Sequence, residues 1–266
     1  MLLDFDRLGP VRFVLAGIAA LVGAFLLLPI AVIVALSFGS SRYLQFPPAT
    51  WTTKWYAQIF ADPDWLGAFL TSLEIATVVA IVATLIGLMA SFALTRGRFA
   101  GREALRGLLL TPMVMPVVIL AVALYAFFLR VHLNGTFVGF VIAHVVVALP
   151  FAIISICNAL ERFDKSIEDA AVLCGASPLE AKIRVTLPAI RDGVFGAVIF
   201  SFLASWDEVV IAIFMASPDL QTLPVRIFSA LRQDLSPVIA AVSTLLVGLT
   251  VALMAIAAFL RKDKPA

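Results

Sequence analysis

The stretch SIEDAAVLCGASPLEAKIRVTLPAI, residues 166–190, is the longest polar interruption in the second half of an otherwise apolar chain. Its pattern predicts two short amphipathic helices that meet at Gly175, because glycine commonly takes a positive φ just after a helix. Ser177, Pro178 and Glu180 match the start of a second helix, with a serine N-cap and a capping box. The sequence therefore predicts a rigid helical hairpin that lies outside the membrane.

The rest of the chain has the composition of a membrane protein. Of its 266 residues, 62% are hydrophobic and 14% are charged, and the mean hydropathy is +1.08. Soluble chains are about half apolar and a quarter charged. A bilayer core of about 30 Å needs about 20 apolar residues per helix, and continuous apolar runs exclude a membrane barrel, whose strands alternate apolar and polar positions. We expect one all-α polytopic domain, residues 1–266, with six transmembrane helices at 13–38, 66–94, 108–129, 137–157, 194–216 and 237–260.

The positions of Lys and Arg predict the orientation of the spans. With both termini cytoplasmic, 14 of the 19 Lys and Arg residues fall on the cytoplasmic side and 5 on the other. Residues 161–190 then lie in the cytoplasm, and Cys157 and Cys174 are expected to be free thiols in a reducing compartment. The first apolar run is too long for the core of a signal peptide, which is about 7–15 residues, and we expect it to be retained. The net charge of +2 gives no argument for nucleic-acid binding.

Ionisable residues inside spans are costly and usually face protein or water. Asp207 and Glu208 fall near the middle of the fifth predicted span. They favour a polar girdle in a translocation path for a cationic or strongly polar solute; the alternative is a structural pair bonded to the backbone or to an arginine of a neighbouring subunit. Glu74, near the outer end of the second span, suits a structural and a functional role equally. His144 is more typical of a core histidine than of a proton relay.

The polar stretch also resembles a known motif. Asp169-Ala170-Ala171, followed by Gly175-Ala176-Ser177 and by Leu187-Pro188, is similar to the EAA motif of ABC-importer permeases, with Asp169 where glutamate is usual. The resemblance covers essentially the whole chain. It implies the type I importer permease fold in a bacterial inner membrane, with residues 161–190 as the coupling region that docks on a cytoplasmic ATPase. The residues that it assigns to this contact are Glu168, Asp169, Ala170, Ala171, Gly175, Ala176 and Ser177.

The same resemblance implies partners. They are two copies of the ATPase subunit, a second homologous permease that forms a heterodimer with this chain, and a periplasmic binding protein. The chain contains no GxxxxGK[ST] loop, so ATP and Mg²⁺ are expected on the ATPase. We expect no catalytic residue, metal site or cofactor in this chain.

A narrower resemblance concerns the solute. The second permease of spermidine/putrescine importers is similar in the run Ser205-Trp206-Asp207-Glu208-Val209-Val210, followed by Thr222-Leu223-Pro224-Val225-Arg226-Ile227-Phe228 and Ser236-Pro237. A carboxylate pair suits a polycation, because each ammonium that leaves water needs compensation. The substrate pathway that we infer comprises Ser205, Trp206, Asp207, Glu208 and Glu74. Two alternatives remain: an importer of another small organic solute, such as an opine or an aminophosphonate, and a stand-alone ion-coupled secondary transporter, although such transporters usually show larger repeat-built bundles.

Overall fold

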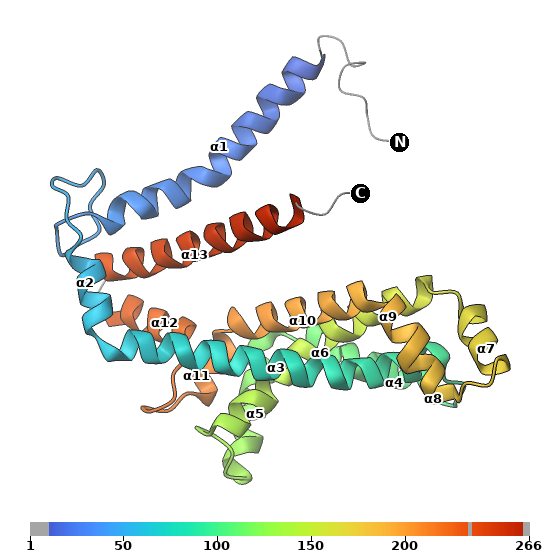
Figure 1. The fold of residues 1–266 in the computed structure, drawn as a ribbon. Coiled ribbons are helices and arrows are strands. Elements are labelled where there is room, and N and C mark those ends of the chain that lie inside the picture. Colours follow the sequence, from blue (N-terminus) through green and yellow to red (C-terminus); the bar gives the residue numbers. More distant parts are fainter. Residues whose placement is uncertain (1–10, 234–235, 263–266) are drawn as a thin grey trace. The chain divides into compact units, whose positions relative to one another are not determined.

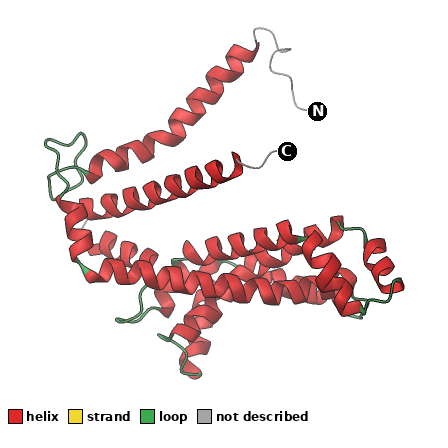
Figure 2. Cartoon of the chain, in the orientation of Figure 1, coloured by secondary structure: helices red, strands yellow, loops and turns green. Residues whose placement is uncertain are grey.

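The computed structural model describes residues 11–233 and 236–262, and helices are the regular elements of that part of the chain (Figure 2). Extended pairing among the described residues is limited to two isolated bridges, Gly39 with Trp51 and Ser217 with Leu220. The all-α prediction is confirmed. The chain divides into two compact units, one formed by residues 1–63 and 229–266 and the other by residues 64–228.

The first unit combines helices from the two ends of the chain: α1 (Val11–Ser37), α2 (Lys54–Ala61) and α13 (Pro237–Lys262). Helix α13 packs against both α1 and α2 (Figure 1). The loop between α1 and α2 is held in place by the Trp55 indole N–H, which donates to the Gly39 carbonyl at 2.6 Å. None of the most apolar window of α1 is buried, so this helix presents the kind of surface that suits lipid.

The second unit is built around three helices: α3 (Pro63–Arg96), α6 (Phe137–Arg162) and α10 (Arg191–Trp206). Small residues bring these helices close together. A Cβ placed on Gly87 of α3 would lie 2.8 Å from the Ala152 Cβ of α6, and one placed on Gly193 of α10 would clash with the Ala159 Cβ of α6. Helix α6 therefore has α3 and α10 packed closely against it, as small residues allow in membrane helices.

Shorter helices surround this centre: α4 (Arg102–Val114), α5 (Val117–Arg130), α7 (Lys165–Leu173), α8 (Pro178–Ala181), the π-helix η2 (Lys182–Thr186), α9 (Leu187–Ala189), α11 (Val210–Met215) and α12 (Leu223–Gln233). The main buried cluster of the unit includes Ile75, Phe140, Ile211 and Met215. It joins the middle of α3 to α6 and α11.

The third predicted span, 108–129, is not one straight helix. Helices α4 and α5 meet at an angle of 104°. The break falls at Met115, which is extended with ψ of 141°, and at Pro116, which precedes α5. Proline disfavours the helical conformation of the residue before it and has no N–H to donate. The third predicted span is thus a bent pair of helices, for a reason that the sequence contains.

The fifth predicted span, 194–216, is also interrupted. Helix α10 ends at Trp206 and α11 begins at Val210, so that Asp207 and Glu208 lie in the break and not on a continuous helix. At its other end, α10 leaves the segment Pro178–Ala189 with a bend of 74°. The two carboxylates, expected near the middle of one span, therefore lie between two helices and not within one.

Three helices of the described residues, α1, α3 and α6, are long and apolar enough to cross a membrane, and the number reaches five if each bent pair is one span. Helix α13 continues the apolar pattern, with a shorter apolar stretch at Pro237–Ala252. The six-span count, the side of each terminus and the single membrane domain stay predictions.

Candidate functional site

The polar stretch folds as the hairpin that the sequence predicts. Helix α7 begins after Asp164, whose carboxylate accepts the Ser166 N–H at 2.9 Å. This hydrogen bond holds the pKa of Asp164 below its usual value. Gly175 has a φ of +101°, which confirms the predicted left-handed turn. We call residues 164–190 the hairpin.

The second arm of the hairpin starts with the predicted capping box. The Ser177 hydroxyl accepts the Glu180 N–H at 3.2 Å, and the Glu180 carboxylate accepts the Ser177 N–H at 3.0 Å. The pKa of Glu180 is lowered by the N–H that its carboxylate accepts. The arm then continues through η2, in which the Leu187 N–H donates to the Lys182 carbonyl, five residues earlier. Isolated π turns of this kind are frequent at functional sites.

The residues assigned to the ATPase contact do not all lie on the surface of the hairpin. Six of them are exposed or half-buried, namely Asp169, Ala170, Ala171, Gly175, Ala176 and Ser177. Glu168 is different: it is 7% exposed, and its carboxylate accepts the Thr186 hydroxyl at 2.9 Å. Glu168 therefore points into the hairpin, away from the surface on which its neighbour Asp169 lies.

Apolar side chains that sequence reasoning missed lie on this surface. Leu173 is 89% exposed, and Leu179 and Ile183 are more than half exposed. Leu173 and Leu179 flank the Gly175 turn, one at the end of α7 and one at the start of α8. The available signal was two leucines, Leu173 and Leu179, within an otherwise polar stretch.

The second group of site residues lies at the α10–α11 break, residues 207–209. Asp207 ends α10 by donating its N–H to the Leu203 carbonyl, and its side chain is exposed. The Glu208 carboxylate accepts the Ile211 N–H at 2.9 Å and so satisfies one donor in the first turn of α11. A side-chain acceptor at this position supports the start of a helix, because the first N–H groups of a helix have no partner within it. The break thus places two carboxylates at the negative end of the α10 dipole.

Neighbouring side chains give the break an aromatic and a buried polar side. The Trp206 ring stacks on Phe202 and meets Phe69 of α3 edge-on, with both pairs of ring centroids 5.7 Å apart. Ser205 is buried and shares a hydrogen bond of 2.8 Å with Nδ1 of the buried His144. Nε2 of that histidine has no hydrogen-bond partner among the described residues. His144 therefore belongs to the packed core, as expected.

The structure does not bring Glu74 to this group. The buried stripe of α3 includes Ser72, Ala76, Val79 and Ala83. Glu74 is exposed and lies about 200° from Ser72 around the helix, given about 100° per residue. It therefore occupies the opposite side of α3 from the stripe that packs within this chain.

The comparisons with known proteins agree with this fold. The family described as "Binding-protein-dependent transport system inner membrane component" matches residues 83–263. The chain belongs to this family. It is the inner-membrane permease component of a bacterial ABC importer, a class whose permease is not itself catalytic.

Two relatives and one solved structure illustrate the similarity. The spermidine/putrescine transport system permease protein PotC of Haemophilus influenzae is 33% identical, over 87% of this permease and 90% of the relative. The putrescine transport system permease protein PotI of Escherichia coli is 34% identical, over 84% and 82%. A bacterial ABC transporter involved in the import of the acidic polysaccharide alginate has the same fold, with a TM-score of 0.69 at 17% identity and 98% coverage of both chains.

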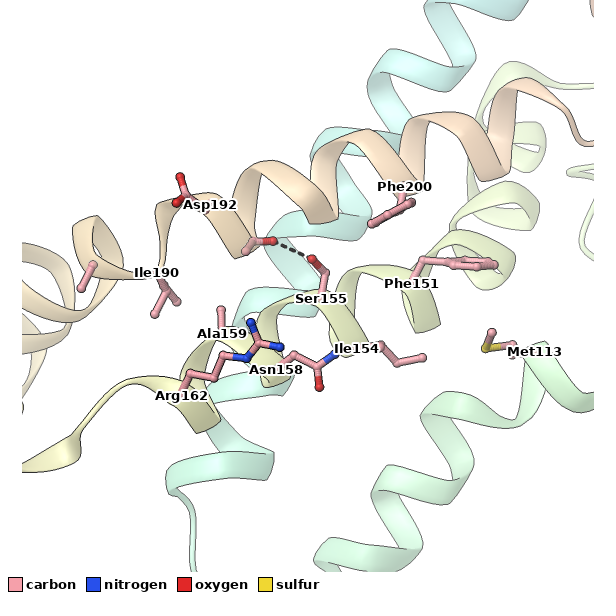
Figure 3. Close-up of a pocket in the computed structure, with 12 residues that line it drawn as sticks. Met113, Phe151, Ile154, Ser155, Asn158, Ala159, Arg162, Ile190, Asp192 and Phe200 are labelled. Atoms are coloured by element: carbon pink, nitrogen blue, oxygen red, sulfur yellow. Dashed lines mark hydrogen bonds between the residues drawn. The ribbon is translucent and has the colours of Figure 1, made fainter. Parts of the chain in front are cut away.

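The permease also has a cavity of about 630 Å³ that sequence reasoning missed (Figure 3). Phe151, Phe200 and Met113 line one end of it, while Arg162 and Asp192 lie at the end near Ile190. Ser155, Asn158 and Arg162 follow one another at i, i+3 and i+7 along α6, which puts them on one face. This polar face on an apolar helix was the available signal. The cavity lies beside the bend that joins the hairpin to α10.

Within the described ranges, the His, Cys, Asp and Glu residues form no group of three or more that could hold a metal ion. The Cys157 and Cys174 side chains are free thiols, one buried and one exposed, as expected.

Proposed function

We propose that this permease carries a polyamine, spermidine or putrescine, and that the solute passes the α10–α11 break. The observation that carries the proposal is the exposed Asp207 carboxylate beside Glu208 and the Trp206 ring, at a point where the helix is interrupted. Two relatives named for spermidine/putrescine and putrescine transport support it.

The chemistry of the break suits an organic polycation. An ammonium group that leaves water needs a compensating charge or hydrogen bonds, which the carboxylates supply. The end of α10 adds a partial negative charge, and the face of an aromatic ring such as that of Trp206 attracts a cation. A chain of methylenes between two ammonium groups can pack on the aromatic cluster, so that charge and apolar length are recognised together.

The membrane architecture proposed for the chain follows its charge distribution. Six spans with both termini in the cytoplasm place the hairpin on the cytoplasmic side, where basic residues are in excess. We propose that the hairpin docks on a cytoplasmic ATPase through its exposed and half-buried residues: Asp169, Ala170, Ala171, Gly175, Ala176, Ser177 and the apolar Leu173 and Leu179. The buried Glu168 stands behind this surface. Two ATPase copies, holding ATP and Mg²⁺, a second permease and a periplasmic binding protein would complete the importer.

The test is uptake of labelled spermidine and putrescine by bacteria that lack their own polyamine import and express this permease with its partner subunits. Asp207→Asn keeps the shape of the side chain and removes its charge. We expect uptake to fall about tenfold or more, because a hydrogen bond to a charged group is worth about 1.5–3 kcal/mol. Asp192→Asn is the matched control, since Asp192 is an exposed carboxylate at the other end of α10.

The outcomes separate the candidate functions. Polyamine uptake that is unchanged in Asp207→Asn would contradict passage along the break. If the wild-type importer moves neither polyamine but takes up another small organic solute, the polyamine assignment is wrong and that solute is the substrate. Uptake that continues without the ATPase subunit would favour an ion-coupled secondary transporter.

A further inference from the structure

Arg96, the last residue of α3, joins three elements of the second unit. Its Nη2 donates to the Leu160 carbonyl and to the Phe163 carbonyl, both at 3.2 Å. These carbonyls lie at the carboxyl end of α6 and just beyond it. Its Nε lies 3.9 Å from the Glu168 carboxylate of α7. One guanidinium therefore connects the ends of two long helices to the first arm of the hairpin.

Glu168 extends this connection to the second arm. Its Oε2, the same atom that faces Arg96, accepts the hydroxyl proton of Thr186 at 2.9 Å. Thr186 is fully buried and is the last residue of the π-helix η2. A second contact between α3 and η2 lies nearby, where the Lys182 ammonium is 5.7 Å from the centroid of the Phe92 ring. Both arms of the hairpin are thus tied to α3.

The Arg96 guanidinium and the Glu168 carboxylate form an ion pair but no hydrogen bond. At 3.9 Å the ion pair is longer than a hydrogen bond, and the buried Nε–H of Arg96 has no hydrogen-bond partner in the described part of the chain. A buried donor without an acceptor is unfavourable, and a charge-assisted bond to a carboxylate is about 2.7–2.9 Å long. A shift of about 1 Å of α7 toward α3 would close this gap.

The carboxylate of this pair lies directly behind the surface of the hairpin. A groove of about 490 Å³ is lined by Arg96 and Glu168 together with the exposed Asp169 and Leu173. Glu168 and Asp169 are consecutive on α7, so a partner that presses on Asp169 also moves Glu168. The groove leaves room for that movement beside α8.

We propose that Arg96, Glu168 and Thr186 form a latch that passes movement of the hairpin to α3 and α6, and that the Arg96–Glu168 gap closes when the ATPase engages the hairpin. The proposal rests on the coupling role proposed above for the hairpin. Arg96 and Thr186 act through Glu168 and are positioning residues, not contacts of the ATPase.

The experiment compares Thr186→Val with Thr186→Ser in the full importer, reconstituted with its ATPase and binding protein in proteoliposomes. Valine has nearly the shape of threonine but cannot donate to Glu168, whereas serine keeps the hydroxyl. The quantities measured are ATPase retention on the permease, ATP hydrolysis, and spermidine or putrescine uptake. We expect Thr186→Val to retain the ATPase and to hydrolyse ATP while uptake per ATP falls at least fivefold, and Thr186→Ser to behave like the wild type.

A second variant keeps the test decisive if Thr186→Val does not assemble. Glu168→Gln still accepts from Thr186 but removes the charge that faces Arg96, and Arg98→Gln is its control, because Arg98 is exposed two residues after Arg96. We expect Glu168→Gln to lower uptake per ATP at least fivefold and Arg98→Gln to leave it unchanged. Wild-type uptake per ATP in either assembled latch variant would overturn the proposal.

Measurements on the wild-type importer test the coupling role of the hairpin independently of the latch. A wild-type permease that does not retain the ATPase, or whose uptake is independent of ATP, contradicts the function proposed for the hairpin before any variant is compared. Loss of the ATPase in both Thr186→Val and Glu168→Gln, while Arg98→Gln keeps it, would show that the three residues only shape the docking surface and would also overturn the latch.

Discussion

The hairpin and the α10–α11 break are both departures from continuous membrane helix, but different forces make them. The hairpin is built from local signals: an N-cap at Asp164, a positive φ at Gly175 and a capping box at Ser177. The break is held by one carboxylate on one backbone N–H and by aromatic and hydroxyl contacts to α3 and α6. Local sequence signals are therefore sufficient to predict the backbone of the hairpin. The backbone of the break depends on contacts with other helices.

The largest effect on solute uptake is expected from a substitution at the turn of the hairpin. Gly175 has a φ of +101° and open space around it, so a side chain there meets backbone strain and no neighbour. Such strain costs about 1–3 kcal/mol. We expect Gly175→Val to retain the permease in the membrane but to lower solute uptake per ATP about tenfold, as measured in proteoliposomes. Gly107→Val is the control, because Gly107 also faces open space and has no positive φ. Normal coupling in Gly175→Val would remove the turn from the mechanism.

At the break, two variants of Glu208 distinguish the role of its charge from its role as a hydrogen-bond acceptor. Glu208→Gln keeps an acceptor for the Ile211 N–H, whereas Glu208→Ala leaves that donor without a partner, at a cost of about 1–3 kcal/mol. We expect both to lower polyamine uptake about fivefold. The melting temperature in detergent should fall only in Glu208→Ala, by about 2–4 °C per kcal/mol. If Glu208→Gln transports normally, the residue serves only to start α11.

The smallest effect is expected at the second cap of the hairpin. Ser177→Ala removes the acceptor of the Glu180 N–H, and an N-cap serine is worth about 1 kcal/mol. We expect the amide protons at the start of α8 to exchange about fivefold faster, as measured by hydrogen–deuterium exchange. Exchange unchanged in α8 would mean that packing, and not the cap, holds this arm.

The same caps give the hairpin a pH dependence with a definite sign. Hydrogen bonds from Ser166 and Ser177 lower the pKa values of Asp164 and Glu180 below 3.8 and 4.5. Their stabilisation is present at neutral pH and is lost as the pH falls through the lowered values. The hairpin should therefore be unaffected between pH 6 and 8, because this range lies above the ordinary pKa values of both carboxyl groups and so above the lowered ones.

The sequence was sufficient for the helical class, the hairpin and the kink before α5, because composition, glycine and proline act through the local backbone. It was not sufficient for the break at Asp207, which depends on where Trp206 and Glu208 find partners, or for the burial of Glu168. Adjacent acidic residues on a short helix look alike in a sequence. The partners of the inward Glu168 are distant in the sequence: Thr186 follows it by 18 residues, and Arg96 precedes it by 72.

Helix α3 contains 34 residues in one continuous element. At about 1.5 Å per residue it is about 51 Å long, against a hydrocarbon core of about 30 Å. It is therefore longer than that core. Arg96 at its end lies 3.9 Å from Glu168 of the hairpin, and the Asp64 carboxylate at its start lies 3.1 Å from the Arg226 guanidinium. A rod of this length turns a tilt of about 5° into a displacement of about 4 Å at the far end. Movement at one end of α3 can thus displace the residues at its other end.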